Sequence, residues 1–206
     1  MTLLGQNVNS YRYERPDGTV VDFPALLALV AQSAEGMRVR FTTSHPKDMS
    51  DETLRIIAAY PNVCRHIHLP VQSGSNRILK LMNRKYTREW YLDRIAAIRH
   101  ILPDCDITTD MFSGFHSETD ADFEELLEFV RKACFERMGA FAYSHEEGTY
   151  AYKHYTDDIP QEVKQERLDS LMRIQERISL AVNQSKIDKV FKVMLDREEE
   201  DFYIGR

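Results

Sequence analysis

Two hydrophobic patterns alternate along the chain. Short apolar runs of strand length are followed by longer segments in which apolar residues recur every three or four positions, as in a helix with one buried face. The short runs predict strands at residues 2–4, 38–43, 64–69, 106–112 and 138–143. The longer segments predict helices at residues 23–34, 51–59, 75–82, 87–101, 120–133 and 160–185. Such alternation is typical of a parallel α/β fold.

Polar or glycine-rich residues follow each predicted strand. These exits are residues 5–7, 44–45, 72–73, 110–114 and 143–145. A doubly wound sheet needs only one or two such exits, whereas a barrel assembles its site from the loops after many strands. The pattern therefore favours an α/β barrel, and Gln72, Ser73 and Ser75 around Gly74 predict a strand end that opens onto a ligand.

Several local signals add detail. Ser50, Thr87 and Thr119 precede predicted helices as N-caps, and Ser75 is a further candidate. Trp90, Ile95 and Ile98 are expected on the inner face of their helix. The remaining segments predict a polar turn region at 10–22, an irregular loop at 150–159, a strand at 190–195 and its hairpin partner at 201–206.

Composition excludes several classes of protein. The chain has 206 residues, 43% of them hydrophobic, so it can bury a core. No apolar run reaches the length of a membrane span, and the first residues lack the pattern of a signal peptide. The net charge of -6 disfavours a protein that coats nucleic acid. Cys64, Cys105 and Cys134 are too few and too widely spaced for a disulfide framework, so a reducing, cytoplasmic setting fits best and we expect three buried, metal-free thiols.

Longer motifs carry a resemblance to a known family. Residues 3–11 (LLGQNVNSY), 40–48 (RFTTSHPKD) and 66–75 (HIHLPVQSGS), followed by Leu81-Met-Asn-Arg84, resemble the radical S-adenosylmethionine (SAM) methylthiotransferases. These segments are most similar to the MiaB-type branch, which modifies tRNA. From about Asp120 onward, residues 141–149 (FAYSHEEGT) and 159–164 (IPQEVK) resemble the RimO-type branch, which modifies an aspartate of a small-subunit ribosomal protein.

The resemblance implies SAM and 4Fe–4S clusters as cofactors. It also implies a partial TIM-like radical SAM barrel over residues 1–187, without its first strand and cluster loop, and a truncated TRAM β module over 188–206. The C-x-x-x-C-x-x-C motif that holds the radical SAM cluster is absent from the sequence. We therefore expect a fragment that is inactive alone, and we identify no catalytic or metal-ligating residue in it.

The resemblance also assigns candidate binding residues. On the cofactor side these are Gln72, Ser73, Ser75, Arg84, Asp110, Gly114 and Glu118; on the substrate side they are Ser44, His45, Tyr143 and His145. His116 and Ser117 stand where the family has proline and glycine, which puts the shape of the Gly114–Glu118 turn in doubt. Asp110 points into the barrel mouth if alternation holds, toward cofactor or substrate.

The predicted activity of the full-length protein is insertion of a methylthio group at carbon 2 of isopentenyl-adenosine in tRNA. The resemblance implies an electron donor such as flavodoxin or ferredoxin as a partner, and it implies no association with a membrane. RimO-type modification of a ribosomal protein is the main alternative. A binding module without clusters and a metal-free barrel enzyme of another kind are the remaining ones.

Overall fold

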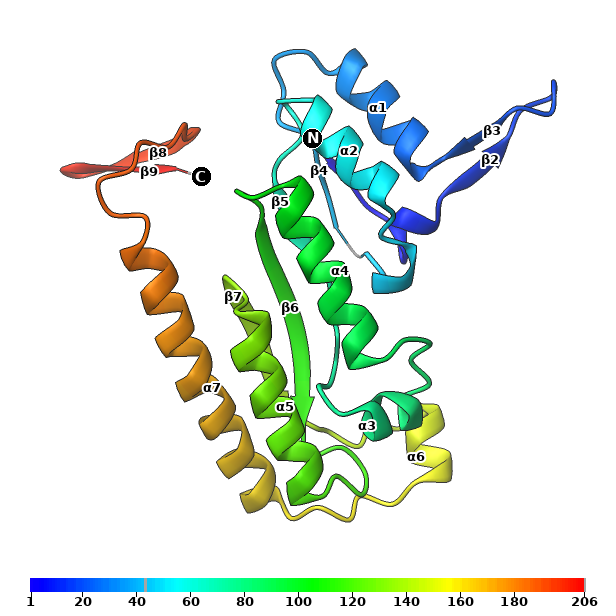
Figure 1. Ribbon diagram of the computed structural model, residues 1–206, viewed down its shortest axis with the longest axis vertical. Coiled ribbons are helices and arrows are strands. Elements are labelled where there is room, and N and C mark those ends of the chain that lie inside the picture. The colour runs from blue at the N-terminus through cyan, green and yellow to red at the C-terminus, as the bar shows by residue number, and fades with distance from the viewer. Residues whose placement is uncertain (43, 206) are drawn as a thin grey trace.

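The computed structural model describes residues 1–42 and 44–205. Its parallel strands follow one another in chain order (Figure 1). β1 (Thr2–Leu3) pairs with β4 (Arg40–Phe41), while β5 (His66–His68), β6 (Asp106–Ser113) and β7 (Arg137–Ala142) form a three-stranded sheet. A parallel bridge between Val39 and Val63 joins the two groups. The predicted parallel α/β arrangement is confirmed, and the strand order agrees with a partial barrel.

Helices cover one side of these strands. Asp22, Ser50, Thr87 and Thr119 cap four of them by accepting the backbone N–H three residues on, so three predicted caps are confirmed. α5 and α7 lie side by side along β6 and β7 (Figure 1). The helices are α1 (Phe23–Ser33), α2 (Asp51–Ala59), α4 (Arg88–Ile101), α5 (Asp120–Ala133) and α7 (Gln161–Gln184), with short turns η1 (Val8–Ser10) and η2 (Pro46–Asp48).

Burial alternates strictly along β6. Ile107, Thr109, Met111 and Ser113 are buried against the helices, whereas the residues between them are half-buried. The main core lies on the helix side, where the rings of Tyr91, Phe129 and Phe135 pack together. The Tyr91 hydroxyl also donates to the Leu69 carbonyl oxygen at 2.6 Å. We call the opposite side of β5, β6 and β7 the open face; it carries His68, Thr108, Asp110, Phe112, Gly139 and Phe141.

Two short helices stand at the carboxyl end of the strands, α3 (Asn76–Leu81) and α6 (Tyr150–His154) (Figure 1). α6 corrects the predicted irregular loop at 150–159. Thr149 accepts the Tyr152 N–H at 3.1 Å and caps one turn of helix that the aromatic composition did not predict. The predicted turn region at 10–22 is also more regular than expected, because β2 (Arg12–Glu14) and β3 (Val20–Asp22) pair as an antiparallel hairpin.

The C-terminal hairpin is shifted from its predicted position. It consists of β8 (Leu195–Glu199) and β9 (Phe202–Gly205), at the end of α7 away from α3 and α6 (Figure 1). Within the described residues, 190–194 pair with no strand, and Val190 is fully exposed. Apolar β-formers make a strand only with a partner beside them, so the strand predicted at 190–195 is wrong except at Leu195. Thr43 and Arg206, which end two predicted strands, lie outside the described residues.

Two predicted core positions are also wrong. Trp90 is 38% exposed, while its neighbour Tyr91 is fully buried, because Tyr91 and not Trp90 is in phase with Ile95 and Ile98. Cys134 is exposed, since it occupies the left-handed C-cap position of α5 (φ 49°). Of the other cysteines, Cys105 is buried as expected and Cys64 is partly buried. In the described part of the chain, no helix is long and apolar enough to be a membrane span.

Gly74 allows the loop after β5 to lie directly on α5. A Cβ added at Gly74 would sit 2.6 Å from Phe129 Cβ and 2.8 Å from Leu126 Cα. We expect Gly74→Ala to lower the free energy of unfolding by about 2 kcal/mol, because the loop or the helix must move. Urea denaturation measures this loss. In Gly5→Ala the new Cβ meets nothing closer than 3.5 Å, so this control should unfold at the wild-type midpoint; equal midpoints for both variants would contradict the prediction.

Candidate functional site

Gln72 occupies the exit of β5 in a strained conformation. Its φ of 77° lies in the left-handed region, which costs free energy for a residue with a side chain. The backbone holds it there, because its N–H donates to the Asp110 carbonyl and its own carbonyl accepts the Phe112 N–H, both at 2.9 Å. Its Oε1 is buried without a hydrogen-bond partner in the described structure. A strained residue with an unsatisfied buried oxygen indicates a ligand site.

The remaining polar residues of this loop face the protein interior. Ser73 Oγ accepts the Ser75 N–H at 3.2 Å, and Ser75 Oγ donates to Asp122 Oδ1 at 2.7 Å. Ser75 stands at the cap position of α3 but makes no cap hydrogen bond there. Both serines are buried, so in this structure they fix the loop onto α5.

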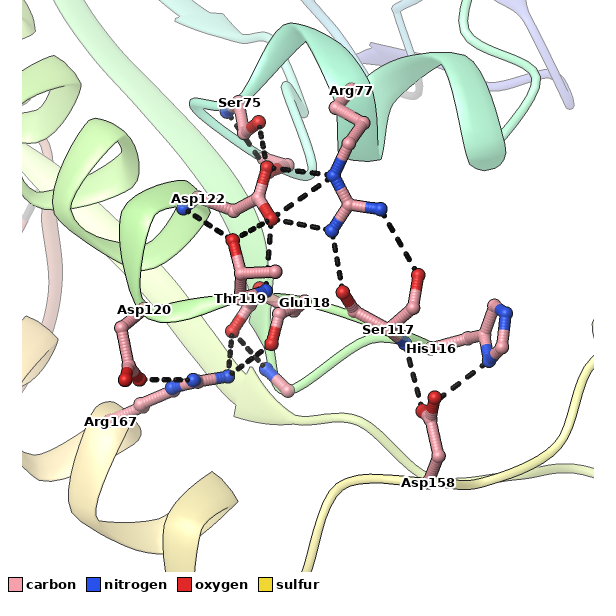
Figure 2. A network of polar contacts seen from close by, with 12 residues as sticks. Ser75, Arg77, His116, Ser117, Glu118, Thr119, Asp120, Asp122, Asp158 and Arg167 are labelled. Carbon is pink, nitrogen blue, oxygen red and sulfur yellow. Dashed lines mark hydrogen bonds and ion pairs between the residues drawn. The ribbon is translucent and has the colours of Figure 1, made fainter.

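Asp122 is the centre of the network in Figure 2. Arg77 Nε donates to both of its oxygens at 3.1 Å, and Thr119 contributes its N–H at 2.9 Å and its hydroxyl at 2.6 Å. Burial raises the pKa of Asp122, but the hydrogen bonds from Arg77, Thr119 and Ser75 outweigh burial and hold the pKa well below its usual range. The ionised carboxylate therefore joins the exits of β5 and β6.

The exit of β6 is a tight turn from Gly114 to Glu118. Gly114 has φ 74° and donates its N–H to Glu118 Oε1 at 2.8 Å; Arg167 Nη1 donates to the same oxygen at 2.9 Å (Figure 2). Burial raises the pKa of Glu118, and the Gly114 N–H and the Arg167 charge oppose this rise. Glu118 is therefore buried and does not contact a ligand directly. It can affect ligand binding only by fixing the conformation of the Gly114–Glu118 turn.

His116 and Ser117 replace the proline and glycine of the motif that this turn resembles. Both contact the segment that precedes α7. The His116 ring stacks on Tyr155 at 4.7 Å, and the Ser117 N–H donates to Asp158 Oδ1 at 2.8 Å. Ser117 adopts φ 54°, the left-handed conformation that glycine would adopt freely. The turn therefore keeps a glycine-like backbone at that position.

A cavity of about 720 Å³ lies between these exits and the two short helices. Three predicted residues line it: Gln72, Arg84 and Tyr143. Sequence reasoning missed most of the aromatic wall. Phe112 could have been predicted, because alternation along the strand from Asp110 places it on the open face. Tyr150 and Tyr155 could not, because they lie in the segment predicted to be an irregular loop. The further lining residues are Lys80, Leu81, Met82, Asn83, Phe112, Phe115, Thr149, Tyr150, Ala151 and Tyr155.

Ser44 and His45 follow β4, in the neighbourhood of Arg84. The His45 N–H is shared by the side-chain oxygens of Asn7 (3.2 Å) and Asn9 (2.9 Å), which ties the exits of β1 and β4 together. Burial, followed by the charge of Arg84, lowers the pKa of His45. Ser44 Oγ is a second buried oxygen with no partner among the described residues.

Tyr143 and His145 follow β7. The Tyr143 ring packs edge-on against Phe115 at 4.9 Å, and its hydroxyl lies 3.2 Å from His145 Nδ1. The buried Lys164 of α7 donates to the Tyr143 carbonyl oxygen at 3.2 Å and to Asp157 Oδ2 at 2.7 Å. Tyr143 thus forms part of the cavity wall, whereas His145 is not among the lining residues and packs against Tyr152.

Asp110 lies outside the residues that line this cavity. It projects from the open face, with Oδ2 3.3 Å from His68 Nε2. Within residues 1–42 and 44–205, no group of three or more His, Cys, Asp or Glu side chains is arranged to hold a metal ion.

Comparison with known proteins places the chain in a family. The sequence model of the Radical SAM superfamily matches residues 3–130. The chain belongs to the radical SAM superfamily. Coproporphyrinogen III oxidase (HemN) from Escherichia coli, a radical SAM enzyme, shares the fold with a TM-score of 0.57 at 18% identity, over 74% of this chain and 36% of that chain. The family implies SAM and a 4Fe–4S cluster as cofactors of the full-length protein.

Curated relatives match all or nearly all of the chain and are about twice as long. The tRNA-2-methylthio-N(6)-dimethylallyladenosine synthase of Bacteroides thetaiotaomicron is 57% identical over 100% of this chain and 46% of its own length. The protein of the same name from Phocaeicola vulgatus is 59% identical over 95% of this chain and 43% of its own length. The chain therefore spans about half the length of the curated relatives it matches.

The charge of Asp122 generates a pH prediction. We expect Asp122→Asn to lower the free energy of unfolding by about 2 kcal/mol at neutral pH, because a buried charged acceptor is lost. Since the folded-state pKa is depressed, the stabilisation is complete above the unfolded-state value of about 3.9 and declines as pH falls below it. Urea denaturation between pH 7 and pH 3 should show the difference shrinking at the acid end.

Asp120→Asn is the matched control in the same helical turn. The Asp120 side chain is fully exposed although it contacts Arg167, so its loss should leave the free energy of unfolding close to the wild-type value. A loss in Asp122→Asn that stays constant with pH, or that equals the loss in Asp120→Asn, would show that the carboxylate charge is not what holds the two exits together.

Proposed function

We propose that this chain is part of a tRNA methylthiotransferase that inserts a methylthio group at carbon 2 of N6-dimethylallyl (isopentenyl) adenosine. One observation carries the proposal: relatives with that activity in their names match 95–100% of the chain at more than half identity. The match includes the residues after Asp120 whose motifs resemble the RimO-type branch.

The cavity fits SAM in size and chemistry. Small-molecule sites of this size are mostly apolar, with a few polar groups that set orientation. Phe112, Phe115 and Tyr143 supply aromatic surface for the adenosyl group, and Arg84 and Lys80 supply positive charge for the methionine carboxylate. Gln72 lines the same wall, and its buried Oε1 has no hydrogen-bond partner among the described residues. The cofactor supplies the radical chemistry, and these residues bind and orient it.

The other candidate residues do not line the cavity, and we assign them supporting roles. Ser73 and Ser75 hold the loop that carries Gln72, and Glu118 shapes the turn that starts at Gly114. Ser44 and His45 lie on the Arg84 side, where a substrate can approach. His145 positions Tyr143 through the 3.2 Å contact of its ring nitrogen with the phenol oxygen.

The full-length protein requires parts beyond this chain. The iron–sulfur ligands and the electron donor, such as flavodoxin or ferredoxin, come from elsewhere, and the protein acts in the cytoplasm. We assign residues 1–187 to the partial barrel and 188–206 to the beginning of a TRAM module. The antiparallel pairing of β8 with β9 supports the second assignment.

A second candidate substrate is a small-subunit ribosomal protein. The observation that favours it is the acidic turn of the C-terminal hairpin, where Glu198, Glu199, Glu200 and Asp201 follow one another. Such a turn is better suited to a basic protein than to the phosphates of tRNA.

Gln72 distinguishes a ligand-binding role from a structural one. Gln72→Met keeps the size of the side chain but removes the unpartnered amide oxygen. We expect the free energy of unfolding of the chain to rise by about 1 kcal/mol, because an unsatisfied buried group is gone. In the complete protein we expect SAM to bind about tenfold more weakly, which corresponds to about 1.4 kcal/mol.

Urea denaturation and calorimetric titration with SAM measure the two effects. Gln165→Met, the same change at an exposed position of α7, should alter neither quantity. A Gln72→Met variant that is less stable and binds SAM normally would make Gln72 a turn residue only.

Deletion of the gene tests the substrate. We expect mass spectrometry of tRNA nucleosides to show that the methylthio group is lost from the adenosine next to the anticodon, while the dimethylallyl group remains. The small-subunit ribosomal protein from the same cells should keep its modification. Loss of methylthio from that protein alone would overturn the tRNA assignment in favour of the second candidate.

A further inference from the structure

The open face carries a histidine–aspartate pair that the cofactor cavity does not use. His68 on β5 lies beside β6, with Nδ1 2.9 Å from Thr108 Oγ1 and Nε2 3.3 Å from Asp110 Oδ2. If Nε2 carries the proton, the ring donates to Asp110 and accepts from the Thr108 hydroxyl, so both ring nitrogens are satisfied. This arrangement fixes the Asp110 carboxylate through its Oδ2 atom.

The other oxygen of Asp110 is kept accessible by a glycine. Asp110 is in register with Gly139 on β7, and a Cβ added at Gly139 would lie 2.6 Å from Asp110 Oδ1. The described residues provide no hydrogen bond to this oxygen, and 39% of the Asp110 side chain is exposed. Inner positions of α/β barrels are usually filled by bulky apolar side chains. A half-exposed, oriented carboxylate at such a position indicates recognition of a hydrogen-bond donor.

Two phenylalanines stand next to this carboxylate along the open face. Phe112 and Phe141 are paired in register, with ring centroids 6.1 Å apart, and Phe141 is 52% exposed. They border a second cavity of about 570 Å³. The second cavity continues the first, because Phe112, Tyr143, Thr149 and Ala151 line both. A ligand on the open face therefore lies directly beside the proposed cofactor.

We propose that the open face is the recognition site for the target base: Asp110 accepts a hydrogen bond from the N6–H of the adenine, and the dimethylallyl group packs against Phe112 and Phe141. The inference rests on the proposed function, and it assigns Asp110 to the substrate side instead of the cofactor side. N6-dimethylallyladenine combines one N–H donor with an apolar chain on the same nitrogen. Asp110 and Phe112 offer an acceptor and an aromatic ring two residues apart on one face of a strand, a separation of about 7 Å.

The chemistry of the ring agrees with this orientation. Carbon 2 is separated from carbon 6 by N1 alone, so a base held by its N6 edge leaves carbon 2 free to face the neighbouring cavity. His68 acts as a positioning residue, since it contacts Asp110 and need not contact the base. Gly139 acts by its small size.

The test uses the complete protein and two anticodon stem-loop RNAs, one with N6-dimethylallyladenosine and one with unmodified adenosine. Fluorescence anisotropy gives the affinity for each RNA, and calorimetry gives the affinity for SAM. For Asp110→Asn we expect about tenfold weaker binding of the dimethylallyl RNA, because a neutral acceptor replaces a charged one, with SAM affinity within twofold of wild type. For Phe141→Ala we expect the affinity for the dimethylallyl RNA to fall by about tenfold or more, to that for the unmodified RNA.

Asp106→Asn is the matched control, because Asp106 lies on the same side of β6 but pairs with Lys186 at 3.1 Å. It should change no affinity. A parallel loss of SAM affinity in Asp110→Asn would overturn the inference and return Asp110 to the cofactor site. An equal loss for both RNAs in Phe141→Ala would also overturn it. If the wild-type protein itself shows no preference for the dimethylallyl RNA, the proposed function fails as well, and that result is visible before any variant is made.

Discussion

A single buried carboxylate connects the parts of this molecule on which a bound cofactor would depend. Asp122 accepts hydrogen bonds from Ser75 in the loop after β5, from Arg77 at the start of α3, and from Thr119 at the cap of α5. A buried charge is tolerated only when its hydrogen-bonding capacity is satisfied. The loop that carries Gln72 and the turn that starts at Gly114 therefore cannot shift independently, since movement of either leaves Asp122 short of a partner.

The first turns of α7 supply a second constraint on the same turn. Arg167 reaches Glu118, and the alkyl part of the buried Lys164 fills the space where a side chain at Gly114 would be, 2.4 Å from the position of its Cβ. Both cations are paired with carboxylates, as burial requires. Residues about 50 positions further along the chain thus determine the geometry of the β6 exit.

Periodicity predicted the strands and long helices because their buried faces follow from side-chain spacing alone. It failed for reasons of three kinds: a contact distant in sequence, a small error in helical phase and an unrecognised helix cap. Ser75 has the residue type and position of a cap, yet Asp122, 47 residues away, takes its hydroxyl. Trp90 and Tyr91 are both large and adjacent, so a small error in helical phase exchanges a buried ring for an exposed one. Tyr150 to His154 form a short helix that Thr149 caps.

The site residues divide in the same way. Gln72, Arg84 and Tyr143 were predicted from strand exits and motifs, and they line the cavity. The same motifs also predicted Ser73, Ser75 and Glu118, but these side chains point into the protein interior. A sequence motif identifies the residue type at a position and does not give the direction of its side chain. Phe112 and His68 could have been found from the alternation that placed Asp110 on the open face.

The contrast between the two faces of the sheet explains how the fold tolerates such a site. The helix side carries the apolar core, with Ile107 and Met111 fully buried, and it supplies most of the stability through burial of apolar surface. The open face contributes little to that core, so it can carry a histidine, a carboxylate and a glycine that packing alone would not select. Where local residue choice departs from what stability favours, a functional requirement is the usual reason. The strained Gln72, whose buried Oε1 has no partner among the described residues, is a second departure from what stability favours, and it lies in the wall of the 720 Å³ cavity.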